Sequence, residues 1–578
     1  MTVPAVAHTA EFQRVLSLPR RVWPAADISA LTVEMTSILK TPGGTMSLRP
    51  VQALALHDAG IERGLFGPIG VGEGKTLITL LTPVVVNAQR PLLLLPAGLI
   101  EKTQRDRLAL SRHWQIPNNL RVLSYDMLGR VQAADELEDY QPDCIICDEV
   151  HRLKNRRAAV TRRVARYMYA HPETIFCAYS GTIMDKSVTD FAHILLWSLK
   201  LGAPMPIKRE EIEEWAEALD EPRGMSWEQF DGRRPGALLE LCTPSEIAEG
   251  PTDRIAARRG FRRRLTETPG VVATIGEGEA IGASIYVRGI VHKVSPTTEK
   301  NFKILRGDGK EFPGWVTPDG WELTSGVDIW RHAQELALGL HYLWDPRPPV
   351  EWREARKAWH AFVNDTISRG RTYDSELHVA NGCDAGQLDG TALARWRELR
   401  PTFTPNVVPM WHDDSALITC RDWMQTPGLV WTEHGFFAEA LAKFADVPYF
   451  GAKGFTADGL YIEDAVKGSS AIASIDANRE GKNLQGLWSR NLLVCPPSSA
   501  LWLEQVIART HRPGQTADEV IVDVLLGCRE NFDAITKAIA GARVIEDMTG
   551  KKQKLSIADV TLPAESEIDA FRSPRWCR

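Results

Sequence analysis

The chain has 578 residues, of which 44% are hydrophobic and 25% are charged, and its formal net charge is −6. A chain of this length is too long for one ordinary hydrophobic core, so two to four domains are expected. The ordinary hydrophobic and charged fractions exclude a fibrous or disordered chain, and the acidic balance means that any nucleic-acid binding depends on local basic surfaces.

No secretory or membrane signal is evident. Residues 1–14 lack an apolar stretch after a basic start, and no window approaches the roughly eighteen apolar residues of a membrane span. Among the nine cysteines, Cys144 and Cys147 lie in an apolar run that favours a strand, where side chains three apart point to opposite faces. We therefore expect a soluble, intracellular, cytoplasmic protein with reduced thiols, no structural metal site and no membrane partner.

Two stretches of the chain alternate strand-length apolar runs with helix-length segments. Runs of this kind, separated by helices, predict parallel sheets covered by helices on both faces. The predicted fold class is α/β, with two lobes of this architecture. In the first lobe the apolar runs are 64–67, 92–95, 122–124, 144–147 and 175–178, and in the second they are 429–431, 471–475, 492–495 and 520–526.

A region of different character separates the two lobes. It is rich in tryptophan and contains amphipathic helix patterns at 331–343 and 352–367, besides a β-rich segment at 270–294. We interpret it as a largely helical accessory insertion, whose tryptophans are expected in the core rather than stacked on bases. The predicted organisation is an N-terminal arm (1–46), a first lobe (47–201), the insertion (202–409), a second lobe (410–546) and a C-terminal tail (547–578).

A glycine-rich loop precedes the helical run 77–86. Closely spaced glycines let backbone N–H groups surround phosphate oxygens at a helix N-terminus. The pattern therefore predicts ATP binding, with the lysine on the β- and γ-phosphates and the threonine on Mg²⁺; a chance glycine-rich turn is the alternative. The residues of this loop are Gly70, Gly72, Gly74, Lys75 and Thr76, and Ile69 stands where the strict pattern has glycine.

Two adjacent acids, Asp148 and Glu149, follow the apolar run 144–147. In a phosphate-binding fold, Asp148 can bind Mg²⁺ while Glu149 polarises the attacking water. Two adjacent acids elsewhere would most often form a solvated turn, but their place after a strand and a phosphate loop favours catalysis.

These residues open a longer pattern. The sequence Asp-Glu-Val-His-Arg-Leu-Lys-Asn at 148–155 resembles the DEAH-type box of superfamily 2 helicases, and its last residues resemble the SWI/SNF branch. Other segments resemble the family's remaining motifs in the same order. They are 48–52, whose glutamine recognises adenine, 95–99 (motif Ia), 124–125 (Ib), 180–182 (III), 429–432 (IV), 481–484 (V) and 505–515 with its HRPGQ sequence (VI).

The resemblance implies two RecA-like lobes that hydrolyse ATP in the cleft between them, and it implies roles for individual residues. Ile69, Ile183 and Ala508 depart from the family's usual residues, which weakens assignment to a chromatin-remodelling subgroup. The implied catalytic residues are Lys75, Asp148, Glu149 and two arginine fingers, Arg509 and Arg512; the nucleotide-binding residues are Gln52, Gly70, Gly72, Gly74, Thr76 and Gly481; the coupling residues are His151, Ser180, Gly181, Thr182 and Gln505.

Nucleic acid would be held mostly through phosphates, which position it without reading its sequence. A solvated charged face is the alternative for any basic cluster. One candidate cluster, on an expected helix of the insertion, includes Arg258, Arg262 and Arg263; a second comprises Lys154, Arg156, Arg157, Arg162, Arg163 and Arg166; and the motifs imply contacts from Pro96, Ser124, Tyr125 and Asn483.

The sequence thus predicts an ATP hydrolase with ATP and Mg²⁺ as cofactors. The first hypothesis is a DNA-stimulated ATPase that translocates on double-stranded DNA in replication, recombination or repair. A strand-separating DNA or RNA helicase is the second, and an ATP-gated nucleic-acid clamp without stepping is the third. The absence of an appended reader domain would suit a bacterial or bacteriophage protein.

Overall fold

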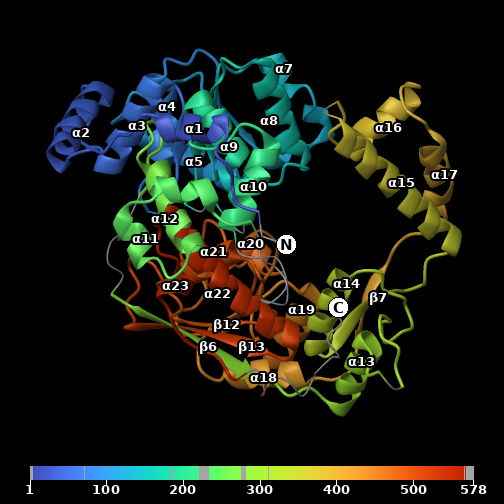
Figure 1. The fold of residues 1–578 in the computed structure, drawn as a ribbon. Helices are drawn as coiled ribbons and strands as arrows, with labels where there is room; N and C mark the ends of the chain where they lie inside the picture. Colours follow the sequence, from blue (N-terminus) through green and yellow to red (C-terminus); the bar gives the residue numbers. More distant parts are fainter. Residues whose placement is uncertain are drawn as a thin grey trace. The chain divides into compact units, whose positions relative to one another are not determined.

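A computed structural model describes residues 4–70, 72–181, 184, 187–220, 233–274, 282–309, 311–370, 372–564 and 567. The chain forms two compact units, and it passes between them several times (Figure 1). Unit 1 consists of Met1–Gly278, Val350–Thr402 and Asp547–Lys551, and unit 2 consists of Glu279–Pro349, Phe403–Glu546 and Lys552–Arg578.

A five-stranded parallel sheet forms the centre of unit 1. In spatial order its strands are β1 (Leu65–Gly67), β5 (Ile175–Tyr179), β4 (Cys144–Asp148), β2 (Pro91–Leu95) and β3 (Arg121–Ser124). Strands β2, β4 and β5 are buried along their whole length, as expected for apolar strands covered on both faces. The helices of the unit that precede residue 278 are α1 (Ala10–Ser17), α2 (Ala25–Leu39), α3 (Pro50–Glu62), α4 (Lys75–Val85), α5 (Ile100–Leu110), α6 (Tyr125–Gly129), α7 (Glu136–Tyr140), α8 (Ala159–Ala170), α9 (Ala192–Leu199), α10 (Arg209–Leu219), α11 (Pro244–Glu249) and α12 (Asp253–Thr266).

Unit 2 is built on a seven-stranded parallel sheet. Its strands, in spatial order, are β10 (Tyr449–Phe450), β11 (Ala471–Ser474), β9 (Leu429–Thr432), β12 (Arg490–Leu493), β13 (Glu519–Leu526), β6 (Ser284–Val291) and β14 (Asp559–Thr561). β7 (Leu340–Trp344) and β8 (Val407–Trp411) form a separate antiparallel pair. The helices of unit 2 are α13 (Pro296–Arg306), α14 (Gly326–Ala337), α18 (Ser415–Trp423), α19 (Gly435–Ala445), α20 (Ile475–Asn478), α21 (Ala500–Thr510), α22 (Arg529–Thr549, whose last residues belong to unit 1) and α23 (Lys554–Ile557).

The predicted α/β class is confirmed, since both sheets are parallel and flanked by helices. Every apolar run that was expected to form a strand overlaps one of the observed strands, and the expected helices after the glycine-rich loop and at 352–367 are present as α4 and α15 (Val350–Arg369). In the parts of the chain that the structure describes, no helix is both long enough and apolar enough to cross a membrane.

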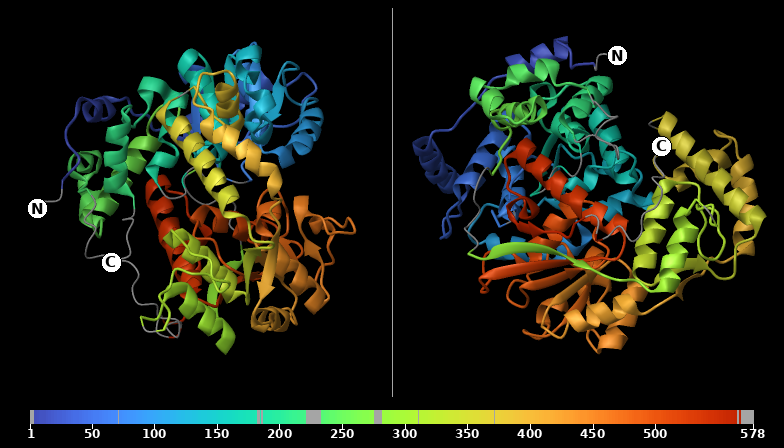
Figure 2. Two further views of the ribbon diagram at one scale, coloured as in Figure 1. Left: turned by 90° about the vertical axis from the view of Figure 1, so that its right-hand side faces the viewer. Right: turned by 60° about the horizontal axis from the view of Figure 1, so that its bottom comes forward.

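The compact units differ from the predicted domain boundaries. The region 202–409 is not one insertion, because residues 202–278 belong to unit 1, residues 279–349 to unit 2 and residues 350–402 to unit 1. The main reason is β6, which pairs with β13 along all eight of its residues, so that the second sheet includes a strand far upstream of residue 410 (Figure 2). The predicted tail likewise adds β14 to the same sheet.

The helix pattern at 331–343 was half right. Helix α14 ends at Ala337, and the residues from Leu340 onward form β7. Gly339 has a φ of +81°, a left-handed conformation that glycine adopts readily and that commonly ends a helix. An apolar pattern that continues through this glycine therefore changes from helix to strand.

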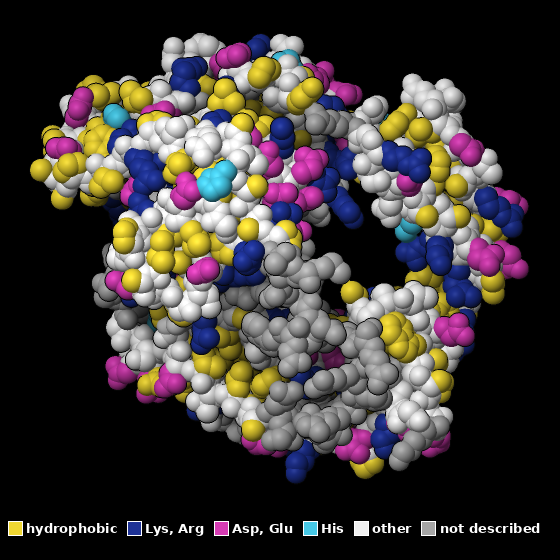
Figure 3. Space-filling model, viewed as in Figure 1, with side chains coloured by type: hydrophobic (Ala, Val, Ile, Leu, Met, Phe, Trp, Pro, Cys, Tyr) yellow, Lys and Arg dark blue, Asp and Glu magenta, His cyan; other side chains and the backbone are white. Residues whose placement is uncertain are grey.

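Three further helices of unit 1, α15, α16 (Glu376–Asp384) and α17 (Thr391–Leu399), are joined to α8 by a buried ion pair. Asp374 accepts hydrogen bonds from Arg163 Nε and Nη2, both at 3.2 Å, and from Arg166 Nη1 at 3.1 Å. The side chains of Asp374 and Arg163 are almost fully buried. In Figure 3 basic and acidic side chains lie interspersed on the surface of α15–α17.

We expect Asp374→Ala to destabilise the protein by about 3–5 kcal/mol, because it leaves the Arg163 guanidinium buried without its counter-charge. Urea unfolding followed by circular dichroism measures this loss. The matched control is Asp384→Ala, which removes a carboxylate that pairs with Arg397 at the surface and should leave the unfolding midpoint unchanged. An unchanged midpoint for Asp374→Ala would contradict the structural role of the pair.

Candidate functional site

The glycine-rich loop connects β1 to α4 at the carboxyl end of β1. Gly72 and Gly74 have φ values of +91° and +74°, in the left-handed region that favours glycine. Lys75, the first residue of α4, donates from Nζ to the carbonyl oxygens of Ile69 at 3.2 Å and Gly70 at 3.0 Å. The loop therefore curls around the ammonium group, as a phosphate-binding loop does; Val71 lies outside the described residues.

Side chains from outside the loop fix its shape. Gln52 Nε2 donates to the carbonyl oxygens of Glu73 and Gly74, both at 3.3 Å, and Arg49 Nη1 donates to the carbonyl oxygen of Gly72 at 2.7 Å. A Cβ on Gly74 would lie 2.3 Å from Gln52 Nε2, so the glutamine packs directly against the loop. Gln52 thus has a clear positioning role, and its predicted role in adenine recognition stays a prediction.

Thr274 is a site residue that sequence reasoning missed. Its Oγ1 accepts a hydrogen bond at 2.8 Å from the backbone N–H of Gly70, across 204 positions of sequence. The reason is that residues 270–274 run alongside β1, with Phe66 and Val271 paired in a parallel bridge. The sequence marked this segment only as β-rich and carries no motif that would link it to the phosphate loop, because its partner strand lies far away in the chain.

The acidic pair stands at the carboxyl end of β4. Glu149 Oε2 accepts a hydrogen bond from Ser180 Oγ at 3.0 Å and lies 3.3 Å from His151 Nδ1. His151 Nδ1 is in turn 3.0 Å from Ser180 Oγ. The structure therefore brings the predicted coupling residues His151 and Ser180 onto the predicted catalytic glutamate.

The two carboxyl groups differ in their electrostatic surroundings. Burial, and next the negative charge of Glu149, raise the pKa of Asp148 above its usual value, although the charge of Lys75 opposes the shift. Burial alone would also raise the pKa of Glu149, but the hydrogen bond with His151 and the charge of Lys75 outweigh it and lower that pKa. Glu149 therefore keeps its negative charge at neutral pH, as a group that polarises water must.

These side chains fit a complex of Mg²⁺ and a nucleotide. The Thr76 hydroxyl and the Asp148 carboxylate are oxygen ligands of the kind that Mg²⁺ prefers, and Mg²⁺ usually takes its remaining ligands from phosphate and water. Among the described residues, no group of three or more His, Cys, Asp or Glu could hold a metal ion. That result is compatible with a nucleotide-bound Mg²⁺, which requires one or two protein ligands.

Three residues of unit 1 that were expected to contact nucleic acid are buried. Pro96 directly follows β2, and Ser124 is the last residue of β3. Ser124 Oγ caps α6 by accepting a hydrogen bond from Met127 N at 3.0 Å. The Tyr125 hydroxyl donates to the Asp148 carbonyl oxygen at 2.7 Å. In this structure Ser124 and Tyr125 therefore support the fold around the acidic pair rather than offer a surface to phosphate.

The arginine cluster of α12 is largely structural. Arg258 is buried and donates to the Leu219 carbonyl oxygen at 2.5 Å, and Arg263 Nε lies 3.3 Å from both carboxylate oxygens of Glu246. Arg262 is half-buried and also has an interaction partner. The expectation that Arg258 and Arg263 present charge to nucleic acid is therefore wrong for this structure, because protein acceptors already use their donors.

Several arginines of the second basic cluster are likewise bonded to acceptors within the protein. Arg163 and Arg166 pair with Asp374, as described above, and Arg162 Nη1 donates to the carbonyl oxygens of Gly370 and Tyr373, both at 3.2 Å. These arginines bind the segment that leads from α15 to α16. The sequence showed a cluster of positive charges, but it did not show the carboxylate and carbonyl oxygens that accept their hydrogen bonds.

In unit 2, the predicted motif V and motif VI residues contact one another. Arg509 is buried, donating from Nη1 to the Lys482 carbonyl oxygen at 3.1 Å and from Nε to the Gln505 carbonyl oxygen at 3.0 Å. Arg512 is half-buried and donates to the same Lys482 carbonyl oxygen at 3.3 Å. Gly481 has a φ of +72°, and the Asn483 side chain is exposed.

The predicted motif III is described only in part. Ser180 and Gly181 are placed, while Thr182 lies outside the described residues. Lys551, from the end of the predicted tail, donates from Nζ to the Gly181 carbonyl oxygen, a contact that no sequence motif indicated. The segment Asp547–Lys551 therefore reaches the same part of unit 1 as the acidic pair.

No protein-family model matches the chain, and no curated protein matches its sequence. Function is therefore inferred from the geometry around Lys75 and Glu149 and from the order of the motifs.

Proposed function

We propose that the protein is an ATP-driven nucleic-acid motor, a DNA-stimulated ATPase that translocates on double-stranded DNA and whose two units are RecA-like lobes. The observation that carries the proposal is the group formed by Lys75, Glu149, His151 and Ser180, which come from a glycine-rich loop and from the ends of two parallel strands. Such a group suits phosphoryl transfer, which depends on positioning and on charge.

In this proposal each side chain has a distinct task. The loop N–H groups and Lys75 bind the phosphates, Thr76 and Asp148 hold Mg²⁺, and Glu149 orients the attacking water. Bound Mg²⁺ supplies the charge that offsets the negative phosphates. Ser180 and His151 hold the Glu149 carboxylate in place. A conformational change at motif III would therefore move the group that activates the water.

A motor rather than a simple ATPase is favoured by the motifs of the second unit. The contacts of Arg509 and Arg512 with Lys482 link motif VI to motif V, the segments that resemble the parts of superfamily 2 enzymes responsible for hydrolysis and nucleic-acid contact. Within that family, the RLKN and HRPGQ sequences favour duplex translocation over strand separation. A helicase acting on forks or RNA is the second candidate, and a clamp without stepping is the third.

An ATPase assay with no nucleic acid, single-stranded DNA, duplex DNA and RNA tests the proposal. We expect duplex DNA to give the largest stimulation, and we expect the stimulation to fall steeply as salt rises, because phosphate contacts release counterions. Displacement of a triplex strand without unwinding of a fork would support translocation. ATP turnover that no nucleic acid changes, at low or high salt, would refute the proposal.

A further inference from the structure

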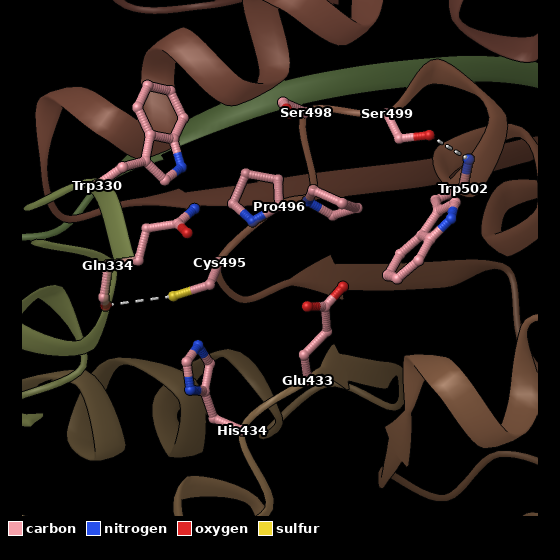
Figure 4. A pocket seen from close by; sticks show the side chains of 10 residues that line it. Trp330, Gln334, Glu433, His434, Cys495, Pro496, Ser498, Ser499 and Trp502 are labelled. Carbon is pink, nitrogen blue, oxygen red and sulfur yellow. Dashed lines mark hydrogen bonds between the residues drawn. The ribbon is translucent and has the colours of Figure 1, made fainter. Parts of the chain in front are cut away.

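Unit 2 contains a cavity of about 250 Å³ that none of the proposed steps of ATP hydrolysis uses (Figure 4). Its walls include Glu433 and His434, which follow β9, and the segment 495–499, which follows β12. The cavity therefore lies at the carboxyl ends of parallel strands, where open α/β sheets bind their ligands.

Two tryptophans form aromatic walls of the cavity, Trp330 from α14 and Trp502 from α21, and Figure 4 shows them on opposite sides. Each ring also has a cation beside it: the Arg479 guanidinium lies 3.7 Å from the centroid of Trp502, and Lys537 Nζ lies 4.5 Å from the centroid of Trp330. Cation–π contacts of this kind hold the indole rings in place. Because the rings are already ordered, ligand binding costs less side-chain entropy.

Between the two indoles lie two polar side chains, the Gln334 amide and the Glu433 carboxylate, which point into the cavity in Figure 4. Within the described part of the chain, neither side chain has a hydrogen-bond or ion-pair partner. By contrast, His434 is 3.3 Å from the Tyr342 hydroxyl, and Ser499 caps α21. The amide and the carboxylate are thus available to hydrogen-bond a ligand, as is the Ser498 hydroxyl, which also lines the cavity.

We propose that this cavity binds a single unstacked nucleobase of a nucleic-acid strand, and guanine best. A flat ring suits the two indoles, since base–aromatic stacking contributes strongly to binding. The adjacent N1–H and N2–H₂ donors of guanine match the two oxygens of Glu433, and the Gln334 amide can donate to O6. A cavity smaller than the roughly 300–1,000 Å³ that holds a drug-sized ligand suits one base rather than several.

The other bases match this donor and acceptor set less well. Adenine and cytosine each offer one exocyclic amino group to Glu433, and thymine offers one ring N–H between two carbonyl oxygens, so none of them presents the two adjacent donors of guanine. The inference rests on the proposed nucleic-acid binding for the source of the base, and it requires an unpaired strand, which the second candidate function, a helicase acting on forks or RNA, would supply. The binding itself does not require ATP.

The test is an equilibrium titration of the full-length protein, without ATP, with two fluorescently labelled strands. One is a short oligothymidylate, and the other carries a single central guanine. We expect the guanine strand to bind about tenfold more tightly, in line with the value of one bidentate contact. Glu433→Gln and Gln334→Leu should each reduce this preference, whereas Glu439→Gln, an exposed carboxylate of α19 outside the cavity, should preserve it.

Equal affinity for the two strands, or a guanine preference that survives Glu433→Gln, would overturn the base pocket. Tight binding of free guanosine monophosphate together with equal affinity for the two strands would indicate a free-nucleotide site and would also overturn it. Failure of every strand to bind would instead count against the proposed nucleic-acid function. The basal ATPase rate of Glu433→Gln should equal that of the wild type, since Glu433 belongs to none of the ATP-site contacts described above.

Discussion

Glu149→Gln is expected to reduce ATP turnover by about 100-fold or more, the usual contribution of a positioned general base. The amide has the shape of the carboxylate, and its oxygen can still accept the hydrogen bond from Ser180 Oγ. It lacks the negative charge that the surroundings of Glu149 preserve by lowering its pKa. Steady-state phosphate release, measured with saturating duplex DNA, gives the loss.

A matched control and a second measurement make this result specific. Glu138→Gln changes an exposed carboxylate of α7 that pairs with His171, and it should leave turnover unchanged. Glu149→Gln should still bind a fluorescent ATP analogue, while Lys75→Ala should lose both binding and turnover, because Lys75 is the positive group inside the loop. Full turnover in the Glu149→Gln protein would overturn the proposed chemistry.

Arg512→Ala is expected to lower turnover by about 1,000-fold, the lower end of the effect of an arginine finger. Arg512 is half-buried and makes one hydrogen bond to Lys482, so its removal should leave the unfolding transition nearly unchanged. Arg512→Lys should not restore turnover, because an ammonium group cannot reproduce the two parallel donors of a guanidinium.

Arg509 provides an internal comparison. It is buried and donates to two carbonyl oxygens of its own unit, so Arg509→Ala should lower stability as well as turnover. Arg421→Ala, which removes a half-buried arginine of α18 that pairs with its neighbour Asp422, should leave turnover unchanged and stability nearly so. If Arg512→Ala retained wild-type turnover in the presence of DNA, the arginine-finger hypothesis would be wrong for this residue.

The elements that could be predicted from the sequence are those determined by local pattern. Buried parallel strands such as β4 and β5 are recognisable as apolar runs. The phosphate loop is recognisable by its glycines, which adopt a left-handed backbone conformation that other residues avoid. Glu149 was predicted as a catalytic residue and Ser180 as a coupling residue, and the structure places the two side chains in hydrogen-bond contact.

What could not be predicted depends on partners that are distant in sequence. The sequence does not distinguish an arginine that faces solvent from one that donates to a buried carbonyl oxygen. Arg258 was expected to face nucleic acid, but it donates to the Leu219 carbonyl oxygen. Thr274 supports the phosphate loop from a segment without a motif. The tryptophans show the same limit, since Trp359 is core as expected, while Trp330 lines a cavity with residues from three other segments.

The position of β6 in the second sheet has a consequence for the folding of the chain during its synthesis on the ribosome. Arg288 of β6 pairs with Asp523 of β13, which lies 235 positions later in the chain. At ordinary rates of translation, β6 waits on the order of tens of seconds for this neighbour, with both of its edges open and its apolar residues Ile285 and Val287 uncovered. Folding during synthesis is therefore expected to need protection of this strand, by a chaperone or by transient nonnative contacts, until β13 and β14 have emerged.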